Sequence, residues 1–224
     1  MKIKPTNTAC DLLAYEKALY AQDTTLIAGV DEVGRGPLVG PVVAAAVILP
    51  RNYELPGLND SKQLSEKKRD AFAKSIMDDA LAYAIGIVLP SKIDEINILE
   101  ASKLAMVMAV NKLKIKPEYL LIDGNQKINS EIPQKTIVKG DSHSLSIAAA
   151  SVIAKVMRDA MMYELDALFP EYEFAKHKGY PTKKHLENIV KYGILDNYRF
   201  TFKPINDLIK KGGIYEGKIR QTNL

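Results

Sequence analysis

The stretch that decides the fold is Thr24–Leu49, which reads TTLIAGVDEVGRGPLVGPVVAAAVIL. Its two short apolar runs, 25–30 and 42–49, are partly β-branched and predict buried strands. The first run ends in the acid pair Asp31–Glu32, and a glycine-rich turn follows, where the backbone can approach a ligand closely. Two adjacent ionised carboxylates at the end of an apolar strand repel each other and resist desolvation, so we expect a divalent metal ion there.

The rest of the chain alternates between helical and strand patterns. We expect helices over 11–21, 66–79, 144–168 and 183–192, two helices within 93–113 broken near Asn97, and strands over 80–89, 119–123 and 136–138. This alternation predicts an α/β protein. No repeat or linker justifies a second domain, so residues 1–224 are expected to form one, with a tail over about 207–224 that is expected to be loosely held after Lys211.

Composition places the chain in the globular class, with 224 residues, 47% hydrophobic and 26% charged. No stretch approaches the ~20 apolar residues of a membrane span, so no membrane association is expected. The single cysteine, Cys10, cannot form an internal disulfide, and residues 1–10 lack the apolar core of a secretory signal. A cytoplasmic protein is therefore expected. The net charge of +4 permits a polyanionic partner without requiring one.

Four carboxylates occupy similar settings along the chain: Asp31, Glu32, Asp123 and Asp141. Asp123 ends an apolar run and Asp141 precedes the 144–168 helix. Mg²⁺ takes oxygen ligands, and two such ions can activate a water and stabilise a leaving oxygen in phosphodiester hydrolysis. Any one of these acids alone could instead be a turn or cap residue. Neighbouring strand residues also point to opposite faces, so Asp31 and Glu32 share a site only if the strand twists or ends there.

Six segments together resemble one known family. They are Gly29–Pro37 (GVDEVGRGP), Asn59–Lys62 (NDSK), Ile122–Asn125 (IDGN), Lys139–Ser142 (KGDS), Ala149–Ser151 (AAS) and His177–Pro181 (HKGYP). Over about residues 25–205 the chain resembles type 2 ribonuclease H (ribonuclease HII) in its bacterial form. The resemblance implies a ribonuclease H-like α/β fold, with a mixed five-stranded central sheet flanked by helices and a helical C-terminal extension.

The resemblance also implies the roles of particular residues. The metal-binding, catalytic acids would be Asp31, Glu32, Asp123 and Asp141. The ribose 2′-hydroxyl would be read by the backbone of Gly34, Arg35 and Gly36 and by Tyr180, and this hydroxyl is what separates RNA from DNA. Flanking phosphates would be held by Ser61 and Lys62, with Lys155 and Arg158 as weaker electrostatic candidates.

The activity implied is cleavage of the RNA strand of RNA–DNA hybrids and cutting at single ribonucleotides embedded in duplex DNA. We expect two Mg²⁺ or Mn²⁺ ions at the site, with water attacking the phosphate 5′ to a ribonucleotide and leaving 5′-phosphate and 3′-hydroxyl ends. A monomer is expected. This chemistry requires no histidine base, so His143, His177 and His185 are expected to be structural or surface groups.

Three other functions are compatible with parts of this sequence. A dinucleotide-binding loop needs a helix after its glycines, whereas 41–49 has a strand pattern, which excludes it. A non-catalytic nucleic-acid binder would not need four clustered acids, which repel phosphate unless metal ions intervene. Junction resolution or integration on a related fold is the nearest enzymatic alternative, and the turn at Gly34–Gly36 together with Tyr180 argues against it. Cleavage of a duplex with and without one ribonucleotide distinguishes these functions.

Overall fold

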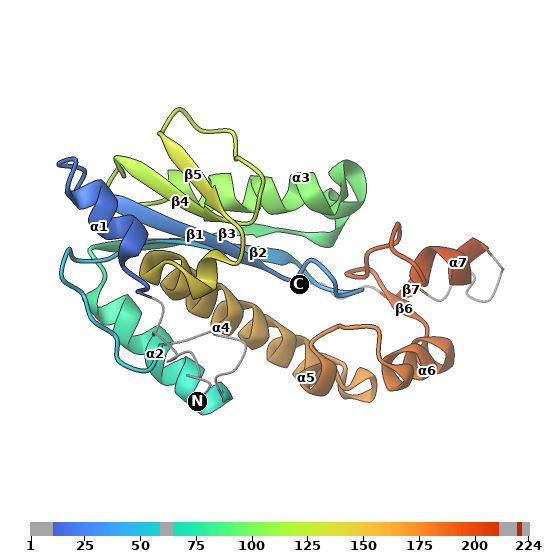
Figure 1. Ribbon diagram of the computed structural model, residues 1–224. Helices are drawn as coiled ribbons and strands as arrows, with labels where there is room; N and C mark the ends of the chain where they lie inside the picture. The colour runs from blue at the N-terminus through green and yellow to red at the C-terminus, as the bar shows by residue number, and fades with distance from the viewer. Residues whose placement is uncertain (1–10, 59–64, 211–218, 221–224) are drawn as a thin grey trace, which may run out of the picture.

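The computed structural model describes residues 11–58, 65–210 and 219–220, and a mixed five-stranded sheet forms its centre (Figure 1). The strands, in spatial order, are β3 (Ala82–Val88), β2 (Val42–Ile48), β1 (Ile27–Val33), β4 (Tyr119–Asp123) and β5 (Gln134–Ile137). β1, β2 and β3 pair antiparallel, whereas β4 runs parallel to both β1 and β5. The predicted mixed five-stranded sheet is therefore confirmed.

Helices cover both faces of this sheet. On one face, α3 (Pro90–Asn111) packs against β1, β2 and β3. On the other, α4 (Leu145–Leu168) packs against β1 and β2, with α2 (Glu66–Asp79) outside it. Figure 1 shows this order of layers, with α1 (Ala14–Tyr20) at the end of the sheet opposite the C-terminal helices.

Strand β2 is buried along its whole length because helices cover both faces of the sheet there. Its even-numbered residues face the α3 layer, and Ala45 and Val47 belong to the core on the α4 side. Three consecutive alanines place only short side chains on both faces of the strand. The helices can therefore approach the sheet closely on either side.

Two glycines mark where the helices come nearest to the strands. A Cβ atom on Gly29 of β1 would lie 2.0 Å from the main-chain carbonyl carbon of Ser146, and one on Gly86 of β3 would lie 2.0 Å from the Ala105 carbonyl oxygen. Neither position has room for a side chain. The contact at Gly29 fixes the first turn of α4 directly beside β1, two residues before the acid pair.

A helical C-terminal extension continues from the end of α4, as predicted (Figure 1). It contains η3 (Pro170–Tyr172), α5 (Phe174–His177), α6 (Lys183–Tyr192), β6 (Ile194–Leu195) and α7 (Ile205–Lys210), and β6 pairs in parallel with β7 (Ile219–Arg220). Its own core is rich in aromatic rings. Tyr172 stacks on Phe174 at 5.2 Å, and the ring of Tyr198 lies 6.3 Å from each of them.

Most predicted elements occur near their expected positions, with adjusted ends. The 93–113 region begins earlier, at Pro90, and its backbone is non-helical at Asn97 (φ 68°, ψ 165°), so the predicted break is confirmed. The Asn97 side chain accepts hydrogen bonds from the amides of Leu99 and Glu100 and thereby caps the second half of the helix. Among the described residues, no helix combines the length and hydrophobicity that crossing a bilayer requires.

Candidate active site

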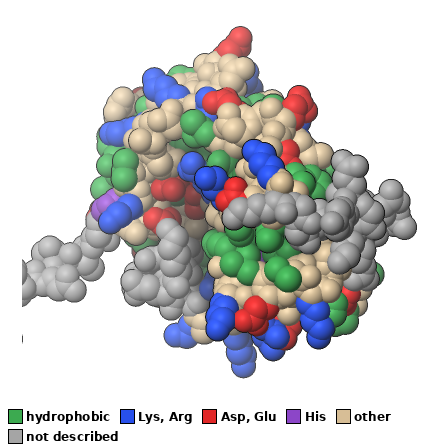
Figure 2. Space-filling view, turned by 90° about the vertical axis from the view of Figure 1, so that its right-hand side faces the viewer, with side chains coloured by type: hydrophobic (Ala, Val, Ile, Leu, Met, Phe, Trp, Pro, Cys, Tyr) green, Lys and Arg blue, Asp and Glu red, His purple; other side chains and the backbone are tan. Residues whose placement is uncertain are grey.

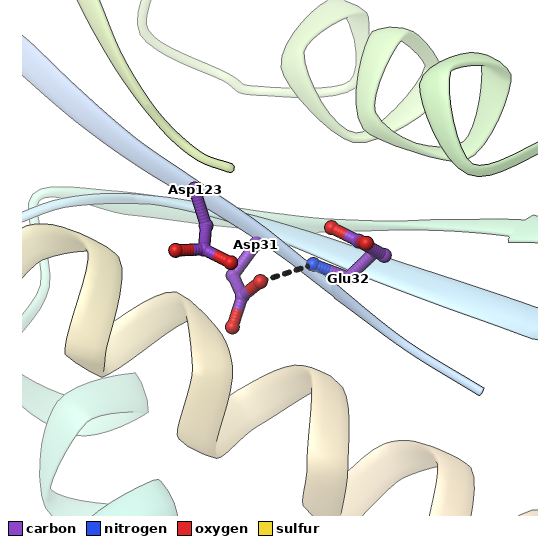
Figure 3. A group of neighbouring side chains, drawn as sticks. All are labelled: Asp31, Glu32 and Asp123. Carbon is purple, nitrogen blue, oxygen red and sulfur yellow. Dashed lines mark hydrogen bonds between the residues drawn. The ribbon is translucent and has the colours of Figure 1, made fainter. Parts of the chain in front are cut away.

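Three of the four predicted acids meet at the end of the sheet (Figure 3). Asp31 and Glu32 come from β1 and Asp123 from the end of β4. One carboxylate oxygen of each lies within 4.8 Å of the others. Asp31 is buried, and the other two are partly buried.

The strand register explains how Asp31 and Asp123 come together. β1 and β4 run parallel and their last paired residues are Val30 and Ile122, so the two aspartates occupy the next position on adjacent strands. Strand alternation turns both toward the α4 face, as Figure 3 shows. Glu32 points to the opposite face by the same alternation. The pairing of β1 with β4 has ended at this point, so β4 does not block the way. The long side chain of Glu32 can therefore reach past the edge of β1 to the carboxylates of Asp31 and Asp123.

Short hydrogen bonds hold the carboxylates in place. Asp31 Oδ1 accepts the amide N–H of Glu32 at 2.7 Å, and Asp123 Oδ1 accepts that of Gly140 at 2.6 Å. Glu32 Oε1 forms an ion pair with Arg35 Nη1 at 3.3 Å. The three acids are therefore fixed by their own strands, by the turn before α4 and by the glycine-rich loop.

The protein environment disfavours negative charge at these acids. Burial raises the pKa of Asp31 well above its usual value, and the charges of Glu32 and Asp123 raise it further, against an opposing hydrogen bond from Ser151. Burial also raises the pKa of Glu32, while Arg35 opposes the rise. A divalent cation would relieve this repulsion, and hard carboxylate oxygens are the ligands that Mg²⁺ and Mn²⁺ prefer. The donor set therefore fits a divalent metal.

Asp141 lies beside the three acids but outside their group. It is buried in the short helix η2 (Gly140–Ser142), and the amide of the preceding residue, Gly140, binds Asp123. The three-acid group, as the described residues define it, does not include Asp141. Its role as a fourth ligand stays a prediction.

The acids open into a pocket of about 430 Å³ that also has a basic wall. Arg69 from α2 and Lys155 from α4 line it, and both pair with Asp159, at 3.5 and 2.6 Å. On the side of the molecule that is turned to the viewer, Figure 2 shows acidic side chains gathered in a depression with basic ones beside them. Arg69 was not predicted from the sequence, and Ser151 was given no role although it belongs to the AAS segment that carries the resemblance. The spacing of four residues between Ser151 and Lys155 places both on one face of α4.

The glycine-rich loop and Tyr180 meet at the mouth of this pocket. A Cβ on Gly36 would lie 3.2 Å from Cε1 of Tyr180, so the ring rests against that glycine. Tyr180 lines the acid pocket and keeps 44% of its surface exposed. Gly34 has φ 95°, a conformation that favours glycine. The structure thus brings the predicted loop, Tyr180 and three acids into one site.

Other predicted residues have different positions. Ser61 and Lys62 lie outside the described residues. The phosphate role considered for Arg158 is wrong, because its side chain is fully buried and donates to the carbonyls of Val39, Pro41 and Lys178. His177 and His185 are buried and stacked with ring centroids 4.1 Å apart, and neither lines the acid pocket.

Comparisons with known proteins agree with this geometry. The family model described as ribonuclease HII matches residues 28–205. A ribonuclease HII from Bacillus cytotoxicus is 57% identical over 200 residues, covering 89% of this chain and 77% of the relative, and one from Bacillus anthracis is 55% identical over 201 residues, covering 90% and 78%. The crystal structure of ribonuclease H2 from Pyrococcus horikoshii OT3 is similar with a TM-score of 0.69 and 27% identity, covering 83% of this chain and 97% of that one.

The match extends from β1 to the start of α7 in the C-terminal extension, and it therefore includes the three clustered acids, the glycine-rich loop and Tyr180. The identity to the Bacillus proteins is high over nearly the whole chain. The chain therefore belongs to the ribonuclease HII family in its bacterial form, and it is an endoribonuclease of the ribonuclease H class.

Proposed function

We propose that this endonuclease hydrolyses the RNA strand of RNA–DNA hybrids and also cuts 5′ to single ribonucleotides embedded in duplex DNA, leaving 5′-phosphate and 3′-hydroxyl ends. The observation that carries the proposal is the shared pocket, in which Tyr180 and Gly36 touch each other beside the three acids. A site that recognises the 2′-hydroxyl there would place the phosphate of a single ribonucleotide beside the acids, without requiring several consecutive ribonucleotides.

The proposed metal ligands are Asp31, Glu32 and Asp123, with Asp141 as the fourth. Two Mg²⁺ or Mn²⁺ ions bound there would supply water activation and would neutralise charge on the leaving 3′ oxygen. The chain itself holds the carboxylates rigid through the amides of Glu32 and Gly140, so little reorganisation is needed when ions bind.

The remaining pocket residues are proposed to bind the substrate. Arg69 and Lys155 form the cationic wall nearest the acids and would contact phosphates on either side of the cleaved bond. Ser61 and Lys62 would hold further phosphates. The ring of Tyr180 would pack on the neighbouring sugar, its hydroxyl would bond to the 2′-hydroxyl, and the backbone of Gly34–Gly36 would complete the reading.

Two duplexes of identical sequence test the proposal, one all-DNA and one carrying a single ribonucleotide. Only the second should be cut, on the 5′ side of the ribonucleotide, with ends identified by labelling with and without phosphatase. Equal cleavage of both duplexes would refute it and would favour junction resolution or integration. The assay is repeated with Mg²⁺ and with Mn²⁺, and light scattering checks the expected monomer.

Matched variants separate catalysis from recognition. Asp31→Asn should abolish turnover while leaving duplex binding largely intact, with Asp78→Asn on the exposed surface of α2 as the charge-matched control. Tyr180→Ala should mainly reduce the preference for ribose over deoxyribose. An active Asp31→Asn enzyme would remove that acid from the mechanism, and an unchanged preference in Tyr180→Ala would remove the proposed role of the ring.

A further inference from the structure

Arg199 is a fully buried cation that binds the glycine-rich loop from the interior of the protein. Its guanidinium donates five hydrogen bonds to the main-chain carbonyls of Gly34 (2.6 Å), Arg35 (3.0 Å), Pro37 (2.9 Å) and Gly40 (2.9 and 3.1 Å). All five N–H groups of the side chain are used. A lysine has three donors on one atom and could not reproduce this planar pattern.

These bonds determine which way the loop amides face. In a planar trans peptide the carbonyl of one residue and the N–H of the next point in opposite directions. Because the carbonyls of Gly34 and Arg35 point toward Arg199, the amides of Arg35 and Gly36 point away from it. Arg199 therefore orients these two backbone N–H donors away from the protein interior, where they could bind a ribose hydroxyl.

The neighbouring residue, Tyr198, is linked through His185 to Tyr180, the side chain proposed to bind the ribose together with the loop. His185 bonds through Nδ1 to the carbonyl of Tyr180 (2.8 Å) and through Nε2 to the hydroxyl of Tyr198 (2.6 Å). The carbonyl can only accept, so Nδ1 carries the proton. Burial lowers the pKa of His185 to about 4, so the ring is neutral at pH 7 and Nε2 accepts from the Tyr198 hydroxyl.

The segment that carries these two side chains is itself firmly attached. The amide of Arg199 donates to Leu38 O (2.8 Å), and Asn197 O accepts the amide of Gly40 (3.0 Å). On the other side, the carboxylate of Asp94 from α3 accepts the amide of Phe200 at 2.7 Å. Residues 197–200 therefore connect the loop to helix α3.

We propose that Tyr198 and Arg199 are positioning residues that set the placement of the Gly34–Gly36 amides relative to Tyr180, and thereby determine the discrimination between ribose and deoxyribose. This inference rests on the proposed reading of the 2′-hydroxyl. Neither side chain touches the substrate. Arg199 acts through the loop carbonyls, and Tyr198 acts through His185 on the Tyr180 main chain.

The test measures the ratio of dissociation constants for the all-DNA duplex and the single-ribonucleotide duplex, in the Asp31→Asn background so that neither is cut. Arg199→Lys keeps the charge and loses the five-bond pattern, and Tyr198→Phe keeps the ring and loses the hydroxyl. We expect each to lower the ratio by about tenfold, the effect of one misaligned hydrogen bond, with unchanged affinity for the all-DNA duplex.

Two remote substitutions of the same chemical kind are the controls. Arg51→Lys and Tyr83→Phe lie at exposed positions outside the site and should leave the ratio unchanged. Thermal unfolding checks that each variant folds, and Tyr198→Phe carries the test if Arg199→Lys does not fold. An unchanged ratio, or an equal loss of affinity for both duplexes, overturns the inference. A ratio near one with Tyr198 and Arg199 intact would instead refute the proposed 2′-hydroxyl reading itself.

Discussion

Replacing Asp31 by asparagine should stabilise the protein when no divalent ion is present. Each of the two neighbouring carboxylates offers an oxygen within 4.8 Å of one from Asp31. At an effective dielectric constant of 20, two unit charges at this distance repel by about 3.5 kcal/mol. The Asp31→Asn substitution removes that repulsion and also the cost of burying a charge, while the oxygen of the new side-chain amide can still accept the backbone N–H of Glu32.

Several interactions reduce the gain. The ion pair between Arg35 and Glu32 already neutralises part of the cluster, and the hydrogen bond from Ser151 is weaker to a neutral amide than to a carboxylate. We expect a net increase of about 2 kcal/mol in the free energy of unfolding, or about 4–8 °C in melting temperature for a chain of this size. The pKa of Asp31 in the folded state is raised, so the wild type loses stability as pH rises through that pKa, and the gain in Asp31→Asn should grow with pH.

The assay is thermal unfolding in a chelator and again with Mg²⁺ or Mn²⁺, at pH 6 and pH 9. Metal should stabilise the wild type more than the variant, because the variant has lost a ligand and binds the ions more weakly. Asp78→Asn, remote and exposed, should change stability by less than about 0.5 kcal/mol. A destabilised Asp31→Asn in chelator, or a gain that shrinks toward high pH, would refute the picture of a repulsive acid cluster awaiting cations.

Three further outcomes are expected. Gly29→Ala should cost about 3 kcal/mol in urea unfolding, because its Cβ would meet the Ser146 backbone at 2.0 Å. Arg69→Gln should weaken duplex binding and lower the slope of log affinity against log salt by about 0.9, one phosphate contact, without changing the site of cleavage. His185 has a folded pKa of about 4 against about 6.5 when unfolded, so the unfolded chain takes up the proton first and stability falls as pH drops between these values. Between pH 7 and pH 5.5 this loss amounts to about 1.2 kcal/mol, and His185→Gln should remove it from the difference between the free energies of urea unfolding at the two pH values.

The sequence predicted the fold well where local patterns and tertiary packing agree. The continuous apolar run of β2 is buried on both faces, and Asn97 interrupts α3 because its side chain caps the following turn. Strand β3 shows where pattern reasoning needs the structure. The larger residues in and beside this strand alternate on one side, yet Leu81 and Tyr83 on that side are exposed. The opposite side, which carries smaller residues, is the one that contacts α3. Helix α3 packs so closely at Gly86 that large residues could not face it.

For the site, the sequence predicted the three acids that cluster but could not show how an adjacent pair shares one centre. The answer depends on strand register, since β4 stops pairing with β1 one residue before Asp31. Arg69 was missed because it lies in a helix that reaches the pocket only through its packing on α4, and charged residues on a helix face are ordinarily solvated. Arg158 was named as an electrostatic candidate for phosphate only through the resemblance, and the sequence could not show that tertiary packing buries its side chain fully.

Arg199 is the case that no local pattern could reveal. It lies 165 residues along the chain from Gly34, in a segment without regular secondary structure, and its partners are main-chain carbonyls, which leave no trace in side-chain identity. A glycine-rich turn of this kind is too flexible to present its amides in a fixed direction by itself. Burying a guanidinium costs free energy unless its N–H groups are all satisfied, and the loop carbonyls satisfy all five. The same bonds that make the buried charge tolerable therefore give the flexible loop its direction, which is why we place the control of ribose reading in the C-terminal extension as well as in the loop itself.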